Sequence, residues 1–85
     1  GLNETYILTM FVYQFRNLLR VKNLLENGLS ESEIVSKTKM HPFVVKKTVY
    51  QCKRFRTEDL QKIYRKLFDA DMAIKTGRIE AGLAL

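Results

Sequence analysis

The chain has 85 residues, is 46% hydrophobic and carries a formal net charge of +6. This length suits one small domain, the hydrophobic content excludes a disordered chain, and no apolar run approaches the ~18 residues that indicate a membrane span. The single cysteine cannot form an internal disulfide and has no companions for a metal site, so we expect a reducing, cytoplasmic location and no membrane partner.

A first long helix is predicted from about Asn3 to Asn27. Apolar residues recur there at the three-, four- and seven-residue spacing of a helix face. They are Ile7, Leu8, Phe11, Phe15, Leu18, Leu19, Val21 and Leu25. The first half is apolar almost all round and is therefore expected to be central, whereas Arg16 and Arg20 mark a wetter side of the second half. Gly28 can supply the left-handed backbone that ends a helix.

Two shorter helices joined by a tight turn are predicted next. Ser30 and Glu33 form a capping-box pattern, and the helix that they open should end near Thr38. Pro42 suits the first turn of a third helix, where its missing N–H is no loss, and this helix should run to about Phe55. The side chains expected to face the core are Ile34, Val35, Val45, Val49 and Cys52.

A fourth helix is predicted to begin at Thr57, which we assign as its N-cap, and to end at Gly77. Its apolar stripe consists of Leu60, Ile63, Leu67 and Ile74. A last helical piece is expected to carry Ile79, Leu83 and Leu85. No segment alternates with the period of two that strands require. The sequence therefore predicts an all-α fold, a compact bundle of about five helices.

Positive charge is concentrated in one stretch. From Lys37 to Arg56 there are seven Lys and Arg and no Asp or Glu, so this stretch carries +7 and the rest of the chain −1. Residues 30–56 are arranged like a helix-turn-helix, and four bases of its second helix share one outward stripe that could contact phosphates. These bases are Lys46, Lys47, Lys53 and Arg54.

The start of the basic helix disfavours base-specific reading of DNA. A recognition helix presents base-reading side chains near its N-terminus, and here that end offers Pro42, Phe43 and Val44. The turn also has Lys39 where such units often place glycine. From these residues a solvated face, nonspecific nucleic-acid contact and sequence-specific reading all stay open. Phe43 and Tyr50 suit interface anchors, although Phe43 could equally pack into its own core.

No group of residues indicates catalysis or a cofactor. His41 is the only histidine and lacks the companions of a zinc site, so it is expected to cap the third helix or to pack beside the neighbouring phenylalanine. The stretch from Lys75 to Gly77 lacks the upstream glycines of a phosphate loop, and Cys52 should be a buried hydrophobe. Asp71 precedes Lys75 by four residues, which predicts either a pair within the helix or a salt bridge to a partner subunit. We therefore predict no enzymatic activity, metal, cofactor or small-molecule substrate.

Three stretches carry a family resemblance: LLRVKNLLENGLSESEI, HPFVVKKTVYQCKRF and DADMAIKTGRI. In this order and at these separations they resemble the C-terminal domain of the delta subunit of bacterial DNA polymerase III, and the resemblance covers nearly all of the chain. It implies a collar domain, which joins the equivalent domains of the other clamp-loader subunits in a ring. Its parent would be an AAA+-like subunit without a working ATPase site that opens the sliding clamp.

The chain begins at Gly1 rather than methionine and stops at Leu85 within a helical pattern. We therefore expect residues 1–85 to be a single helical domain, the collar domain excised from such a subunit. DNA binding should be weak and nonspecific at most. The alternative is a free-standing helix-turn-helix-like nucleic-acid-binding domain. The residues that we assign to the partner interface as a hypothesis are Arg20, Phe43, Lys46, Lys47, Tyr50, Asp71 and Lys75.

Overall fold

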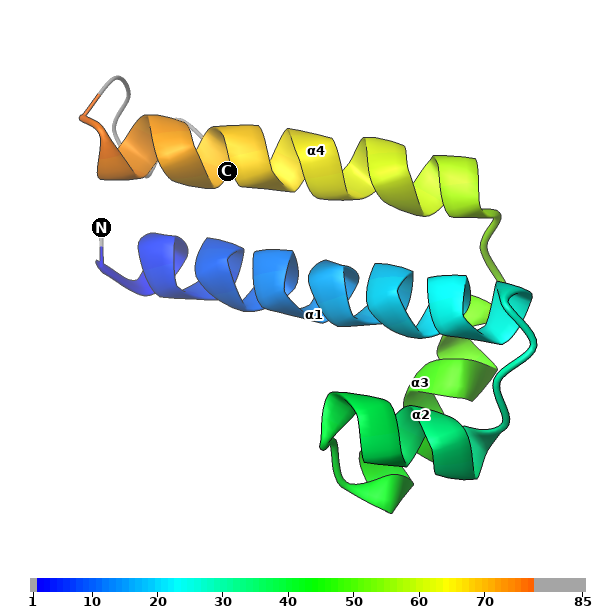
Figure 1. Cartoon of the computed structure of the whole chain (residues 1–85). Helices are drawn as coiled ribbons and strands as arrows, with labels where there is room; N and C mark the ends of the chain where they lie inside the picture. Colours follow the sequence, from blue (N-terminus) through cyan, green and yellow to red (C-terminus); the bar gives the residue numbers. More distant parts are fainter. Residues whose placement is uncertain (1, 78–85) are drawn as a thin grey trace.

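A computed structural model describes residues 2–77 and shows an all-α fold, as predicted. Within this range there are four helices and no strand: α1 (Leu2–Glu26), α2 (Glu31–Thr38), α3 (Pro42–Cys52) and α4 (Thr57–Lys75). Helices α1 and α4 lie side by side, and α2 and α3 pack beneath one end of α1 (Figure 1). The fifth helix, predicted to carry Ile79, Leu83 and Leu85, lies outside the described residues.

The end of α1 and the start of α2 are set by local backbone chemistry. Gly28 has φ 86°, and its N–H donates to the carbonyl of Leu25, while the N–H of Leu29 donates to the carbonyl of Leu24. This pair of bonds is the Schellman arrangement that glycine favours at a helix end. One residue later the predicted capping box is present, because the Ser30 hydroxyl accepts from the Glu33 N–H and the Glu33 carboxylate accepts from the Ser30 N–H.

The turn between α2 and α3 positions the basic helix. Lys39 adopts the left-handed conformation with φ 62°, a conformation that glycine usually takes. His41 is the N-cap of α3, and its Nδ1 accepts from the Phe43 N–H at 3.1 Å. Pro42 occupies the first helical position. Of the two roles that the sequence left open for this histidine, the structure shows the cap.

Two boundaries differ from the prediction. Helix α3 ends at Cys52 rather than near Phe55. Thr57 is the first residue of α4 and not its N-cap; the N-cap is Arg56, whose backbone is extended and whose side chain makes no capping hydrogen bond. The Thr57 hydroxyl donates instead to the carboxylate of Glu26 at the end of α1. As the first helical residue, Thr57 does not occupy the N-cap position, and its hydroxyl bonds to a charged acceptor on another helix.

One hydrophobic core joins all four helices where α2 and α3 meet α1. Its buried members are Leu18, Val21, Leu24, Ile34, Val45, Val49, Cys52 and Leu60. Phe15 and Phe55 close one side of it with an edge-on ring contact, 6.4 Å between centroids. We call this region the corner. It comprises α2, α3, the second half of α1 and the beginning of α4.

The first half of α1 and the second half of α4 form a two-helix extension, which we call the arm (Figure 1). The prediction that the first half of α1 is central was wrong. Of residues 4–14, only Leu8 and Val12 are buried. The exposed large side chains of this half are Tyr6, Ile7, Met10, Phe11 and Tyr13. Nor is the bundle compact, because its radius of gyration is 14.5 Å, against about 12 Å for a compact domain of this length.

Candidate functional site

The described residues contain no group of three or more His, Cys, Asp or Glu side chains that could hold a metal. Cys52 is fully buried, and burial raises the pKa of its thiol, which disfavours the reactive thiolate. His41 uses one ring nitrogen as a cap. None of the helices from residue 2 to 77 is long and apolar enough to cross a membrane. The features that remain to be explained are therefore on the surface.

The basic stripe predicted on α3 is exposed. Lys46 and Lys47 lie on the helix, and Lys53 and Arg54 lie in the turn that follows it. Tyr50 is 65% exposed in the middle of the stripe. The Arg54 guanidinium lies over the Tyr50 ring, 5.1 Å from its centroid, and donates to the Tyr50 hydroxyl at 3.1 Å. This stacking holds one arginine in place at the surface.

Phe43 is 70% exposed in the first turn of α3, so it does not pack into the core of its own chain. It lines two neighbouring hollows, one between α1 and α3 and one between α2 and α3. Its neighbour Val44 is 43% exposed. The helix end that would have to read bases in a DNA-binding protein thus presents apolar side chains.

The hollow between α1 and α3 is a groove of about 590 Å³. One wall carries Met10 and Tyr13 of α1, and the other carries Phe43 and Val44 of α3. Lys47 and Arg54 also line it. Sequence reasoning did not assign Met10 and Tyr13 to a site. The available signal was the all-round apolar pattern of the first half of α1. Such a pattern indicates either a helix buried in its own chain or a helix covered by another chain.

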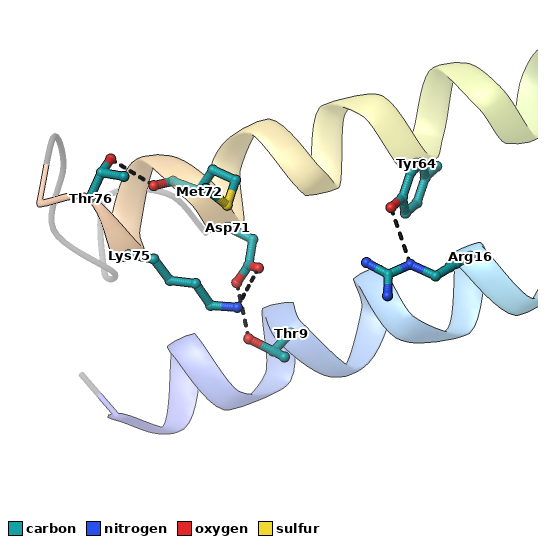
Figure 2. A network of polar contacts seen from close by, with 7 residues as sticks. All are labelled: Thr9, Arg16, Tyr64, Asp71, Met72, Lys75 and Thr76. Carbon is teal, nitrogen blue, oxygen red and sulfur yellow. Dashed lines mark hydrogen bonds and ion pairs between the residues drawn. The ribbon is translucent and has the colours of Figure 1, made fainter.

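Asp71 lies in the seam between the two helices of the arm and is only 4% exposed (Figure 2). Its Oδ1 accepts from the Thr9 hydroxyl at 3.0 Å, and its Oδ2 pairs with Nζ of Lys75 at 2.8 Å. Further along the seam, Nε of Arg16 donates to the Tyr64 hydroxyl at 3.3 Å. The carboxylate of Asp71 is therefore engaged within the domain, whereas the Lys75 side chain is 47% exposed.

The other residues that we singled out in the sequence lie either in the corner or in the arm. Arg20 is exposed on α1, seven positions after Tyr13 and so on the same side of the helix. Gly77 follows α4 with φ 76°, and its N–H donates to the carbonyl of Ile74 at 3.0 Å. The structure brings Phe43, Lys47 and Tyr50 onto one surface of the corner. Asp71 and Lys75 lie apart from them, in the arm.

The fold and this surface define an all-α domain whose prominent features are apolar and basic side chains rather than reactive ones. The family described as the C-terminal domain of the DNA polymerase III delta subunit matches residues 2–85, and the chain belongs to this family. It is also 35% identical, over 79 residues, to the DNA polymerase III subunit delta of Bacillus subtilis (strain 168). That match covers 93% of this chain and 23% of the relative. The comparison with solved structures found no match.

Proposed function

We propose that this chain is the subunit-assembly domain of a DNA polymerase III delta subunit. In this role it holds the subunit in the clamp loader, the complex that places the sliding clamp on DNA. The proposal rests on membership of the delta C-terminal family, which the three sequence stretches and the family match both support. In this role the chain contributes binding surface.

The observation that carries this proposal is the amount of apolar surface that the chain leaves without cover. Among residues 4–77, nine large hydrophobic side chains are exposed, five of them on the first half of α1 and three on α3. Large exposed apolar side chains on the arm and around the groove supply surface that a neighbouring subunit would cover.

A second candidate function is direct contact with nucleic acid through the basic stripe. Lys46, Lys47, Lys53 and Arg54 are all exposed, which favours phosphate contacts that weaken as salt rises. The exposed apolar start of α3 supplies no base-reading group, so any such binding should not depend on sequence. A salt titration with two duplexes of unrelated sequence measures this. Sequence-selective, submicromolar binding at physiological salt would favour a helix-turn-helix function over assembly.

The assembly function is tested by removing this domain from the full-length subunit. The intact subunit and the shortened one are each mixed with the other clamp-loader subunits, and the products are separated by size-exclusion chromatography. We expect only the intact subunit to enter the complex. An intact subunit in which Lys62 and Lys66 on the exposed side of α4 are both replaced by alanine serves as a surface control. Normal assembly by the shortened subunit would disprove the proposal.

A further inference from the structure

We infer that the groove between α1 and α3 binds an amphipathic helix of a partner subunit that carries carboxylates beside its apolar residues. This inference rests on the proposed assembly function and goes beyond it, because it assigns one surface and the chemistry of its occupant. The walls, the length and the charge of the groove each contribute to the argument.

Each wall is a row of side chains at helical spacing. On α1 the row runs through Met10, Tyr13 or Gln14, and Asn17; on α3 it runs through Val44 and Gln51. Each row covers seven positions, or roughly 10 Å, which is about two helical turns. An occupant helix that places apolar residues at positions i, i+3 or i+4, and i+7 matches this length. The groove volume of about 590 Å³ can receive several such side chains.

The corner forms the floor of the groove. Its side chains pack against each other or form hydrogen bonds within the chain. Leu18 is buried, and Phe15 and Phe55 contact each other edge-on. Thr48 is also buried, and its hydroxyl donates to the carbonyl of Val44 at 2.7 Å. The floor therefore offers no unpaired polar group to a small ligand. It offers a firm apolar base for side chains that enter from a partner.

The charge of the groove identifies the occupant more closely. Among the described residues that line it, two are cations, Lys47 and Arg54, and none is acidic. Over residues 2–77 the structure gives neither cation a carboxylate partner, and Arg54 is held over Tyr50. Carboxylates on the rim of an occupant helix would pair with these cations, while its apolar residues would meet Met10 and Val44.

The same features disfavour nucleic acid as the occupant. A DNA duplex presents phosphates and is too wide to enter a groove between two helices, so the apolar walls would stay uncovered. The cations Lys46 and Lys53, which duplex binding would also use, do not line the groove. A helix with both apolar and acidic residues uses the walls and the two lining cations together.

Site-specific photo-crosslinking in the assembled clamp loader identifies the occupant. A benzophenone amino acid replaces Gln51, which lines the groove, or Gln61, an exposed glutamine on α4 that serves as a matched control. Mass spectrometry then locates the cross-linked segment. We expect Gln51, and not Gln61, to capture a helical segment of another subunit with apolar residues at i, i+3 or i+4, and i+7 and with Asp or Glu beside them. Capture of DNA, or of a segment without acidic residues, would overturn the inference.

Charge reversal tests the pairing itself. In the full-length subunit, K47E together with R54E should weaken assembly by about tenfold or more and abolish much of its salt dependence. The matched control K62E with K66E, on α4, should change it by less than about twofold. If the reversed protein melts below wild type, the charge-neutral pair K47M and R54M, which keeps the aliphatic stems, is used and should weaken assembly by about three- to tenfold.

These outcomes separate the inference from the assembly function. If removal of the whole domain prevents assembly but neither pair of groove variants weakens it, the groove assignment is wrong and the assembly function stands. If removal of the domain leaves assembly unchanged, the assembly function fails first, and the groove inference fails with it.

Discussion

Asp71 is the only charged side chain that is buried among the residues the structure describes. A carboxylate removed from water must recover its lost hydration from hydrogen bonds or from an opposite charge. Asp71 does both, because Thr9 of the opposite helix donates to one oxygen and Lys75 pairs with the other. The contact fixes how far α1 and α4 can slide past one another.

Replacing Asp71 by alanine should lower the free energy of unfolding by about 1–3 kcal/mol, because a charge-assisted hydrogen bond is lost and the Thr9 hydroxyl loses its acceptor. Urea denaturation followed by circular dichroism measures the change. Asp69→Ala, at an exposed position of the same helix, is the control and should cost no more than about 0.5 kcal/mol. Equal losses for the two variants would contradict the role assigned to Asp71.

Glu33 makes the stability of the α2 capping box depend on pH. The Ser30 N–H donates to its carboxylate at 2.9 Å, and this bond holds the pKa of Glu33 below its ordinary value. A carboxyl group with a lowered folded-state pKa stabilises the fold above its unfolded pKa, and this contribution is lost as pH falls through the folded pKa. Stability should therefore decrease between neutral pH and about pH 3, the range in which such groups become protonated.

Glu33→Gln should make that decrease smaller, since the variant cannot gain a proton at this position. Urea midpoints at the two pH values measure the difference. Glu31→Gln removes the same charge from the same turn, and residues 2–77 show no such hydrogen bond for Glu31. An equal effect of the two substitutions would mean that general charge, and not the capping box, causes the pH dependence.

Helix α1 has a buried and an exposed apolar side along the arm. Leu8 is 2% exposed, and the adjacent Ile7 is 47% exposed. Leu8→Ala should therefore lower the free energy of unfolding by about 2–4 kcal/mol, as expected for a buried side chain that leaves a cavity. Ile7→Ala should lower it by less than about 1 kcal/mol. Thermal and urea unfolding measure both, and the reverse order would mean that the opposite side of α1 faces α4.

The helices themselves could be predicted because their ends depend on neighbours in sequence. Gly28, the Ser30 capping box and Pro42 act on backbone groups within a few residues, and the predicted boundaries around them are close to those observed. The corner could be predicted for a similar reason. Its buried residues Val45 and Val49 repeat with the period of one helix face.

The arm could not be predicted in the same way. An all-round apolar helix gains the same free energy whether its cover comes from its own chain or from another, so composition alone does not distinguish a central helix from an exposed one. Contacts between distant residues leave no periodic signal. The hydrogen bonds from Thr57 to Glu26 and from Thr9 to Asp71 are of this kind, and so the role of Thr57 was assigned incorrectly. For the same reason, the sequence did not decide whether Phe43 is exposed or packs into the core of its own chain.

For the molecule as a whole, the corner and the arm differ in how far apart their contacting residues lie in the chain. Helices α2 and α3 are neighbours in sequence, whereas α1 and α4 are the first and last of the described helices. The hydrogen bond between Thr9 and Asp71 joins residues 62 positions apart. Closing so long a loop costs conformational entropy before any contact in the arm compensates for it.

The corner should therefore form first during folding, and the two long helices should close against each other last. Leu8→Ala should then accelerate unfolding and leave the refolding rate almost unchanged, whereas Ile34→Val in the corner should slow refolding. Stopped-flow mixing with urea measures both rates. If Leu8→Ala slows refolding in proportion to its loss of stability, the arm is already closed in the transition state, and the proposed order is wrong.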